Sequence, residues 1–273
     1  MDTYLQVNIE IESDLQREIV TAELISIGFD AFEEETKLLK AYVLQNDFDE
    51  KAFNSIVDLH QLNYEVESIL SKNWNEEWEK NFHPVVIGNF CSVRANFHEP
   101  NKNTAFDLVI TPKMSFGTGH HATTYLMLEL LQEVAFRDAA VLDFGTGTGI
   151  LAIMAEKLGA SKVTAIDLDD WSIRNATENA AMNSCSRIQL VQADNIPADK
   201  SFKIILANIN KNVIVDDLPV MCKVLEDNGD ILLSGLLEPD FAQINAEATK
   251  LGLHLQKKGE KSGWIALRYM KLL

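Results

Sequence analysis

A short apolar run that ends in a glycine-rich loop constrains the fold of this chain more than any other feature; it reads VLDFGTGTG at residues 141–149. The apolar residues 139–144 predict a buried strand, and a helix is expected to begin at Ile150. Glycines at 145, 147 and 149 carry no Cβ, so a ligand can approach their backbone closely. A strand, a glycine loop and a helix in this order predict a βα turn of an open α/β sheet, where such folds bind ligands.

Polar side chains also end the next predicted strands. Asp167 ends a strand in TAIDLDD, and Asn208 ends another in ILANI. The carboxyl ends of parallel strands lie at one edge of a sheet. We therefore expect Asp143, Asp167 and Asn208 to lie around one site.

The spacing of these residues bears on the kind of ligand. The dinucleotide fingerprint G-x-G-x-x-G requires a third glycine at position 150, which is Ile150 here. A carboxylate at Asp143 is unfavourable beside a pyrophosphate but favourable beside an ammonium or sulfonium group. Asp167 follows Gly145 by 22 residues, close to the roughly 20-residue spacing of an acid that accepts hydrogen bonds from ribose hydroxyls. The pattern favours a nucleoside cofactor that carries an amino acid over NAD.

Strand and helix patterns alternate from about residue 120 to 273, which predicts a mostly parallel sheet with helices on both faces. Strands are expected at 139–144, 163–167, 188–192, 203–208 and 230–236, followed by a closing pair near 254–258 and 264–270. The segment from Gly259 to Gly263 is expected to be the turn of this pair, which allows an antiparallel arrangement.

The N-terminal part of the chain has a different organisation. Residues 1–70 follow the order β-α-β-β-α-β, which is typical of a small ferredoxin-like α+β domain. Residues 71–84 are polar, with Trp74, Trp78 and Phe82 spaced by four, and predict a short connecting helix that ends at Pro84. The predicted domains are 1–70, a helical linker at 71–84, and 85–273.

The charge and the cysteine and histidine content limit the classes of partner and ligand that this chain is expected to bind. The formal net charge of −17 repels phosphate backbones, which disfavours direct nucleic-acid binding and is compatible with a basic protein partner. Three cysteines far apart in sequence predict neither a disulfide framework nor a zinc site. His120 and His121 are adjacent in a loop and lack the spacing of a helical metal pair, so no metal is expected. No signal peptide or long apolar segment is visible, and a cytoplasmic protein is expected.

Several motifs together resemble one family of enzymes. VLDFGTGTGILAIMAEKLGA, TAIDLDD and ILANI are similar to motifs of the class I S-adenosylmethionine-dependent methyltransferases. WNEEWEKNFHPVVIG at 74–88 and PKMSFGTGHHATTYLMLELL at 112–131 resemble the interdomain segment and the cofactor loop, FGTGTHPTT, of the ribosomal protein L11 methyltransferases. The resemblance covers nearly the whole chain. It implies a Rossmann-like domain with a seven-stranded sheet, S-adenosyl-L-methionine as cofactor, ribosomal protein L11 as acceptor, and an N-terminal domain that recognises the substrate.

The resemblance also implies roles for individual residues. Thr124, Gly145, Asp167 and Asn208 match cofactor-binding positions, and Asn208 lies where the methyl group is transferred. Further expected cofactor contacts are Phe116, Gly117, Asp143, Gly147 and Asp194.

The sequence departs from the family pattern in three places. Thr146 and Thr148 replace Cys and Ser in the glycine loop, with little expected effect. His120 and Ala122 replace Thr and Pro, and Lys211 adds a positive charge near the expected acceptor site.

The expected reaction is the transfer of methyl groups to amines of ribosomal protein L11, on lysines and, as a second kind of acceptor, on the N-terminal amine, with Asn208 orienting the amine. One alternative keeps this chemistry with another protein or a small-molecule amine as acceptor. A second alternative is an NAD-dependent oxidoreductase.

Overall fold

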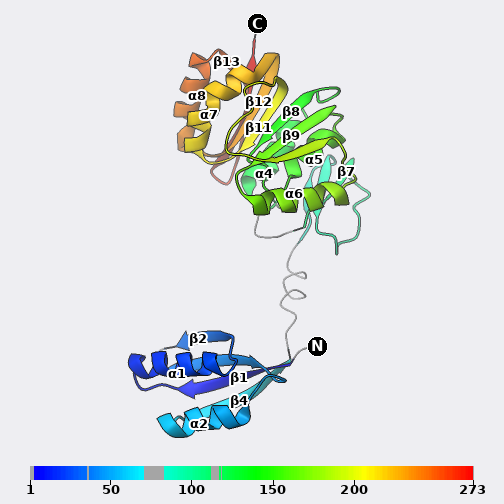
Figure 1. Cartoon of the computed structure of the whole chain (residues 1–273). Helices are drawn as coiled ribbons and strands as arrows, with labels where there is room; N and C mark the ends of the chain where they lie inside the picture. The colour runs from blue at the N-terminus through cyan, green and yellow to red at the C-terminus, as the bar shows by residue number, and fades with distance from the viewer. Residues whose placement is uncertain (1–2, 36, 71–82, 112–116, 118, 273) are drawn as a thin grey trace. The chain divides into compact units, whose positions relative to one another are not determined.

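The computed structural model describes residues 3–35, 37–70, 83–111, 117 and 119–272. The chain divides into two compact units, Met1–Phe82 and His83–Leu273 (Figure 1). Most of the expected linker helix, residues 71–82, lies outside the described residues. None of the helices in the described ranges has the length and apolar character needed to cross a bilayer.

The first unit has the predicted β-α-β-β-α-β order. Its elements are β1 (Thr3–Glu10), α1 (Asp14–Ser26), β2 (Ala31–Glu35), β3 (Leu38–Leu44), α2 (Glu50–His60) and β4 (Tyr64–Leu70). The strands form an antiparallel sheet in the order β2-β3-β1-β4, which confirms the ferredoxin-like topology. Ser13 is the N-cap of α1 as expected, since its hydroxyl accepts the Gln16 N–H at 3.2 Å. Alternate residues of the sheet, such as Val7 and Ile9, are buried against both helices in one core.

The second unit is built on a seven-stranded sheet. Its strands are β8 (Ala140–Phe144), β9 (Lys162–Asp167), β10 (Ile188–Gln192), β11 (Phe202–Asn208), β12 (Leu225–Leu237), β13 (Leu253–Lys261) and β14 (Trp264–Lys271). They lie in the order β10-β9-β8-β11-β12-β14-β13, and β14 runs antiparallel to both of its neighbours. The other described pairings of this sheet are parallel. The predicted Rossmann-like, mostly parallel sheet is confirmed.

Helices cover both faces of this sheet because its strands are apolar on both sides. Val141 and Ile204 face one core, with α4 (Ala122–Leu131) and α5 (Ile150–Lys157). Leu142 and Ile205 face the other, with α7 (Lys211–Val224) and α8 (Phe241–Lys250). A further helix, α6 (Asp170–Met182), packs beside α5 against β9 and β10. The sheet is therefore the middle layer of three.

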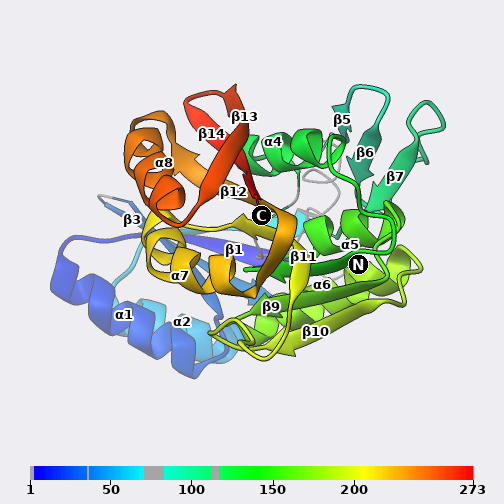
Figure 2. The same cartoon turned by 90° about the horizontal axis from the view of Figure 1, so that it is seen from above.

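Two smaller features complete the unit. Strands β5 (Val85–Ile87), β6 (Cys91–Arg94) and β7 (Phe106–Val109) form a separate small sheet beside α4 and α5 (Figure 2). A short 3₁₀ helix, η1 (Glu238–Asp240), links β12 to α8.

The closing hairpin is antiparallel, as the sequence allowed, but its predicted turn was wrong. Gly259 lies within β13 and pairs with Ala266. The turn is the two-residue pair Ser262 and Gly263, with φ of 52° and 78°. Positive φ at both positions is typical of a tight hairpin turn that matches the twist of its strands. This tighter turn sets Trp264 at the start of β14.

Candidate active site

A cavity of about 640 Å³ lies at the carboxyl ends of β8, β9 and β11. In this sheet the strand order reverses at β8, because β9 lies on one side of it and β11 on the other. Ligands of open α/β folds bind at such a reversal. Among the sequence-predicted site residues, Gly145, Gly147, Asp167, Asp194 and Asn208 line this cavity.

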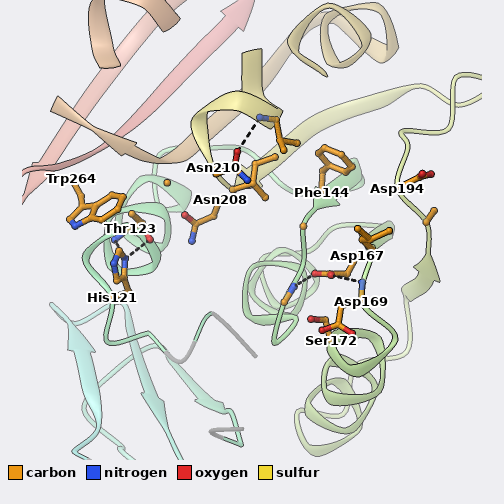
Figure 3. A pocket seen from close by; sticks show the side chains of 17 residues that line it. His121, Thr123, Phe144, Asp167, Asp169, Ser172, Asp194, Asn208, Asn210 and Trp264 are labelled. Atoms are coloured by element: carbon orange, nitrogen blue, oxygen red, sulfur yellow. Dashed lines mark hydrogen bonds between the residues drawn. The ribbon is translucent and has the colours of Figure 1, made fainter. Parts of the chain in front are cut away.

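The side chains of the cavity form two groups (Figure 3). We name the first the acidic side; it consists of Asp167, Asp169, Ser172 and Asp194. We name the second the amide side; it consists of His121, Thr123, Asn208 and Trp264. Phe144 lies between the two groups.

The glycine loop lines the cavity through Gly145 and Gly147. The N–H groups of Gly145 and Thr146 each donate to the Ile166 carbonyl at 2.9 Å, which holds the loop against β9. Gly145 has φ of 75°, and a Cβ there would lie 2.2 Å from Ile209 Cγ2. Any side chain at 145 would therefore collide with the start of the segment after β11, besides adopting a strained backbone.

Asp167 is held by the backbone on the acidic side. Its Oδ2 accepts the Gly147 N–H at 2.8 Å, and its Oδ1 accepts the Asp169 N–H at 3.0 Å. Each carboxylate oxygen has a second lone pair, so the fixed carboxylate can still accept hydrogen bonds from a ligand. This is the geometry required of an acid that binds ribose hydroxyls. The exposed Asp194 lies further along the same side.

Asn208 is the central residue of the amide side. Its Nδ2 donates to Thr124 Oγ1 at 3.4 Å. Its Oδ1 is buried and has no hydrogen-bond partner among the described residues. A buried acceptor without a donor costs free energy, about 1–3 kcal/mol, unless a ligand supplies the donor. Asn208, which lines the cavity at the carboxyl end of β11, therefore has an unused amide oxygen.

Three residues of the amide side, His121, Thr123 and Trp264, were missed as site residues by the sequence analysis. His121 is the N-cap of α4, and its Nδ1 accepts the Thr123 N–H at 3.3 Å. Its ring packs edge-to-face against Trp264, with ring centres 4.7 Å apart. Histidine is not among the preferred N-cap residues Ser, Thr, Asp and Asn, so the only signal in the sequence was the position of His121 just before an apolar helix. Trp264 had no such signal, because only the pairing of β14 with β12 brings it to the site.

Asp143 is not among the described residues that line the cavity. Its side chain is 1% exposed, and its Oδ2 accepts hydrogen bonds from Thr146 Oγ1 at 2.6 Å and Ala152 N–H at 3.2 Å. Burial, with a smaller contribution from the nearby Asp167 carboxylate, raises the pKa of Asp143 to about 7 against the opposing effect of these two hydrogen bonds. Asp143 thus lies behind the glycine loop and braces it from within.

The other predicted residues have different surroundings. Thr124 is fully buried and contacts Asn208. It is not among the described residues that line the cavity. Gly117 lies against the glycine loop, where its carbonyl accepts the Thr148 hydroxyl at 2.6 Å. Phe116 lies outside the described residues. Lys211 pairs with Asp240 at 3.0 Å, so its positive charge is compensated.

This chain is similar to known proteins of one family of methyltransferases. The family described as "Ribosomal protein L11 methyltransferase (PrmA)" matches residues 5–271. A protein named ribosomal protein L11 methyltransferase from Porphyromonas gingivalis is 42% identical, with 95% of this chain and 92% of the relative covered. A protein of the same name from Phocaeicola vulgatus is 38% identical, with 93% of each chain covered.

A solved structure shares the architecture. The crystal structure of a ribosomal protein L11 methylase from Lactobacillus delbrueckii subsp. bulgaricus is similar with a TM-score of 0.64 and 28% identity; it covers 70% of this chain and 100% of that chain. The family match spans both units, and the fold and cavity agree with the motifs that indicated a methyl donor. The chain therefore belongs to the ribosomal protein L11 methyltransferase family of S-adenosyl-L-methionine-dependent methyltransferases.

Proposed function

We propose that this protein methylates amino groups of ribosomal protein L11, at lysine side chains and at the N-terminal amine. The observation that carries the proposal is the buried, unpartnered Oδ1 of Asn208, a residue that lines the same cavity as Asp167 at the carboxyl end of β11. An amine is a hydrogen-bond donor of the kind that this oxygen lacks. The names of the relatives from Porphyromonas gingivalis and Phocaeicola vulgatus supply the acceptor protein.

The acidic side and the glycine loop fit S-adenosyl-L-methionine. Asp167 is fixed by two backbone N–H groups and retains lone pairs for ribose hydroxyls. Gly145 and Gly147 leave room for a ligand against the backbone, and Asp194 and Gly117 are further proposed contacts. The cofactor supplies a methyl group made electrophilic by a sulfonium sulfur.

Two predicted cofactor residues act indirectly in this proposal. Asp143 braces the glycine loop through Thr146 and Ala152. Thr124 accepts a hydrogen bond from Asn208 Nδ2, which turns the amide so that Oδ1 is the free end. Both residues then shape the site without touching the ligand.

The amide side is where the acceptor amine would bind. A lysine amine has a pKa of about 10.4 and must lose a proton before it can act as a nucleophile. Removal from water on entering the cavity favours the neutral form. Asn208 Oδ1 then accepts one N–H of the amine and fixes the direction of its lone pair, and Trp264 supplies an apolar surface for the lysine stem. Alignment of this kind requires no strong general base and can contribute several kcal/mol.

The small N-terminal domain is proposed to recognise the protein substrate. In its sheet the residues that alternate with the buried ones include Glu33, Glu65 and Glu67, which are exposed. An acidic surface attracts basic proteins, and the net charge of −17 acts in the same direction. We assign the reaction to the cytoplasm, where ribosomal proteins are made.

The test is to incubate the enzyme with labelled S-adenosyl-L-methionine and ribosomal protein L11 and to locate the label by mass spectrometry. We expect label on amino groups of ribosomal protein L11. Label on a different protein or on a small amine would change the acceptor while preserving the chemistry. No transfer of label, together with tight binding of NADH, would overturn the proposal in favour of an oxidoreductase.

A further inference from the structure

Two buried asparagines, Asn179 in α6 and Asn183 at its C-cap, join that helix to segments distant in sequence. Asn175, Asn179 and Asn183 are spaced by four and are each at most 6% exposed. Asn179, in the middle, is fully buried: its Nδ2 donates to the Thr148 carbonyl at 2.8 Å, and its Oδ1 accepts the Thr111 N–H at 2.9 Å. One side chain therefore links the glycine loop to the chain just after β7.

Thr148 makes a second link with its side chain. Its hydroxyl donates to the Gly117 carbonyl at 2.6 Å and is itself buried. Gly117 has φ of 107°, and a Cβ there would lie 2.7 Å from Thr148 Oγ1, so the two segments can approach this closely only with glycine at 117. The glycine loop is thus tied to both Thr111 and Gly117, on the chain that leads into α4.

These bonds connect directly to the acidic side of the cavity. Thr148 follows Gly147, whose N–H donates to Asp167 Oδ2 at 2.8 Å. A shift of Thr148 would move Gly147 and release one of the two backbone donors that hold the Asp167 carboxylate. The effect would reach the cofactor side of the site although Asn179 and Thr148 are absent from the cavity lining in the described part of the chain.

We propose that Asn179 and Thr148 are positioning residues that form a clasp, defined as the three hydrogen bonds joining Asn179 to Thr111, Asn179 to Thr148, and Thr148 to Gly117. The clasp fixes Thr111 and Gly117 against the glycine loop, and so sets the affinity for S-adenosyl-L-methionine. The inference rests on the proposed function, because it assumes that the cofactor lies on the glycine loop and Asp167.

Asn183 provides a matched control on the same helix. Its side chain makes three hydrogen bonds: it accepts the Val109 N–H at 2.9 Å and donates to the carbonyls of Val109 at 2.6 Å and Asn179 at 2.8 Å. It is buried like Asn179, but within the described part of the chain its side chain bonds to Val109 and Asn179 and not to the glycine loop. Asn183→Ala should therefore destabilise the fold about as much as Asn179→Ala without moving the loop.

The experiment is calorimetric titration of the full-length protein with S-adenosylhomocysteine, at a temperature where every variant is folded. Asn179→Ala is expected to weaken binding about tenfold, since it leaves a buried carbonyl and a buried N–H without partners. Asn183→Ala is expected to stay within about twofold of wild type. Thr148→Val, which keeps the side-chain shape, should weaken binding several-fold, and Thr148→Ser should restore it by returning the hydroxyl. KM for the acceptor protein should be unchanged throughout.

Equal losses of affinity in Asn179→Ala and Asn183→Ala would overturn the clasp, because the effect would then be one of general stability. Wild-type affinity in Thr148→Val would overturn it as well. If Asn179→Ala does not fold, the Thr148 pair decides the question. A wild-type protein that binds no S-adenosylhomocysteine would contradict the proposed function itself, and this outcome is distinct because it does not depend on any variant.

Discussion

The two sides of the cavity are built in different ways. The glycine loop and Asp167 come from consecutive strand ends, β8 and β9, and the hydrogen bonds that join the loop to the end of β9 link residues about 20 positions apart. The amide side combines the start of α4, the end of β11 and the start of β14, so that Thr124 meets Asn208 and His121 meets Trp264. The first side depends on local chain geometry, and the second depends on the packing of the whole second unit. Changes on the two sides should therefore alter different properties of the enzyme.

The largest effect is expected on the amide side, at Asn208. In Asn208→Ala the amine loses its hydrogen-bond acceptor, and kcat is expected to fall about 100-fold, comparable to the loss of one preorganised group at a reacting centre. The measurement is steady-state methylation of ribosomal protein L11 with saturating cofactor. A variant with wild-type kcat would remove Asn208 from the reaction.

The next largest effect is expected in the glycine loop, at Gly145. Gly145→Ala combines an unfavourable positive φ with a collision against Ile209. Affinity for S-adenosylhomocysteine should fall by more than tenfold, and Tm should fall as well. Gly252→Ala is the matched control, because its φ of 78° is similar but a Cβ there would meet nothing within 4 Å. Gly252→Ala should lower the free energy of unfolding only by the backbone strain, about 1 kcal/mol. Similar cofactor affinities for the two variants would refute the steric account of position 145.

A smaller effect that separates the two sides is expected at Trp264. Trp264→Ala removes the apolar surface beside His121, so KM for the acceptor protein should rise about tenfold while cofactor affinity stays near wild type. Trp171→Ala is the control: this tryptophan is 41% exposed on α6 and is not part of the described cavity lining. A rise in KM that is the same for both variants would show that Trp264 has no specific role.

The smallest effect concerns Asp143 and depends on pH. Its pKa is raised to about 7 in the folded protein by burial, whereas an unfolded chain has a value of about 3.9. The folded state therefore binds the proton more tightly, and this contribution to stability is lost as pH rises from about 4 to about 7. Asp143→Asn resembles the protonated acid, so its Tm should exceed that of wild type at pH 8, exceed it by much less at pH 5, and lie close to it at pH 4.

The control for this pH dependence is Asp199→Asn, at an exposed position. It should show no comparable difference between pH 5 and pH 8. If Asp143→Asn has the same Tm advantage at both pH values, the carboxyl of Asp143 does not titrate in this range.

The same difference between the two sides determines which site residues could be predicted from the sequence. Asp167, Gly145 and Asn208 could be found because each lies at a strand end, and the sheet rule brings such ends together. The sequence placed Asp143 at the same edge, but not the direction of its side chain, which is turned inward by Thr146 and the start of α5. The turn of the last hairpin was misassigned because Gly259 and Gly263 are equally good turn residues, and only pairing with β14 decides between them. Trp264 depends on that pairing.

The most direct test of this account is to measure the affinity for S-adenosylhomocysteine in Asp167→Ala and Asn208→Ala side by side. The account predicts a loss of at least about tenfold in Asp167→Ala, because the ribose loses its acceptor, and a value within about threefold of wild type in Asn208→Ala. Unchanged affinity in Asp167→Ala, or a larger loss in Asn208→Ala than in Asp167→Ala, would contradict the division of the cavity into a cofactor side and an acceptor side.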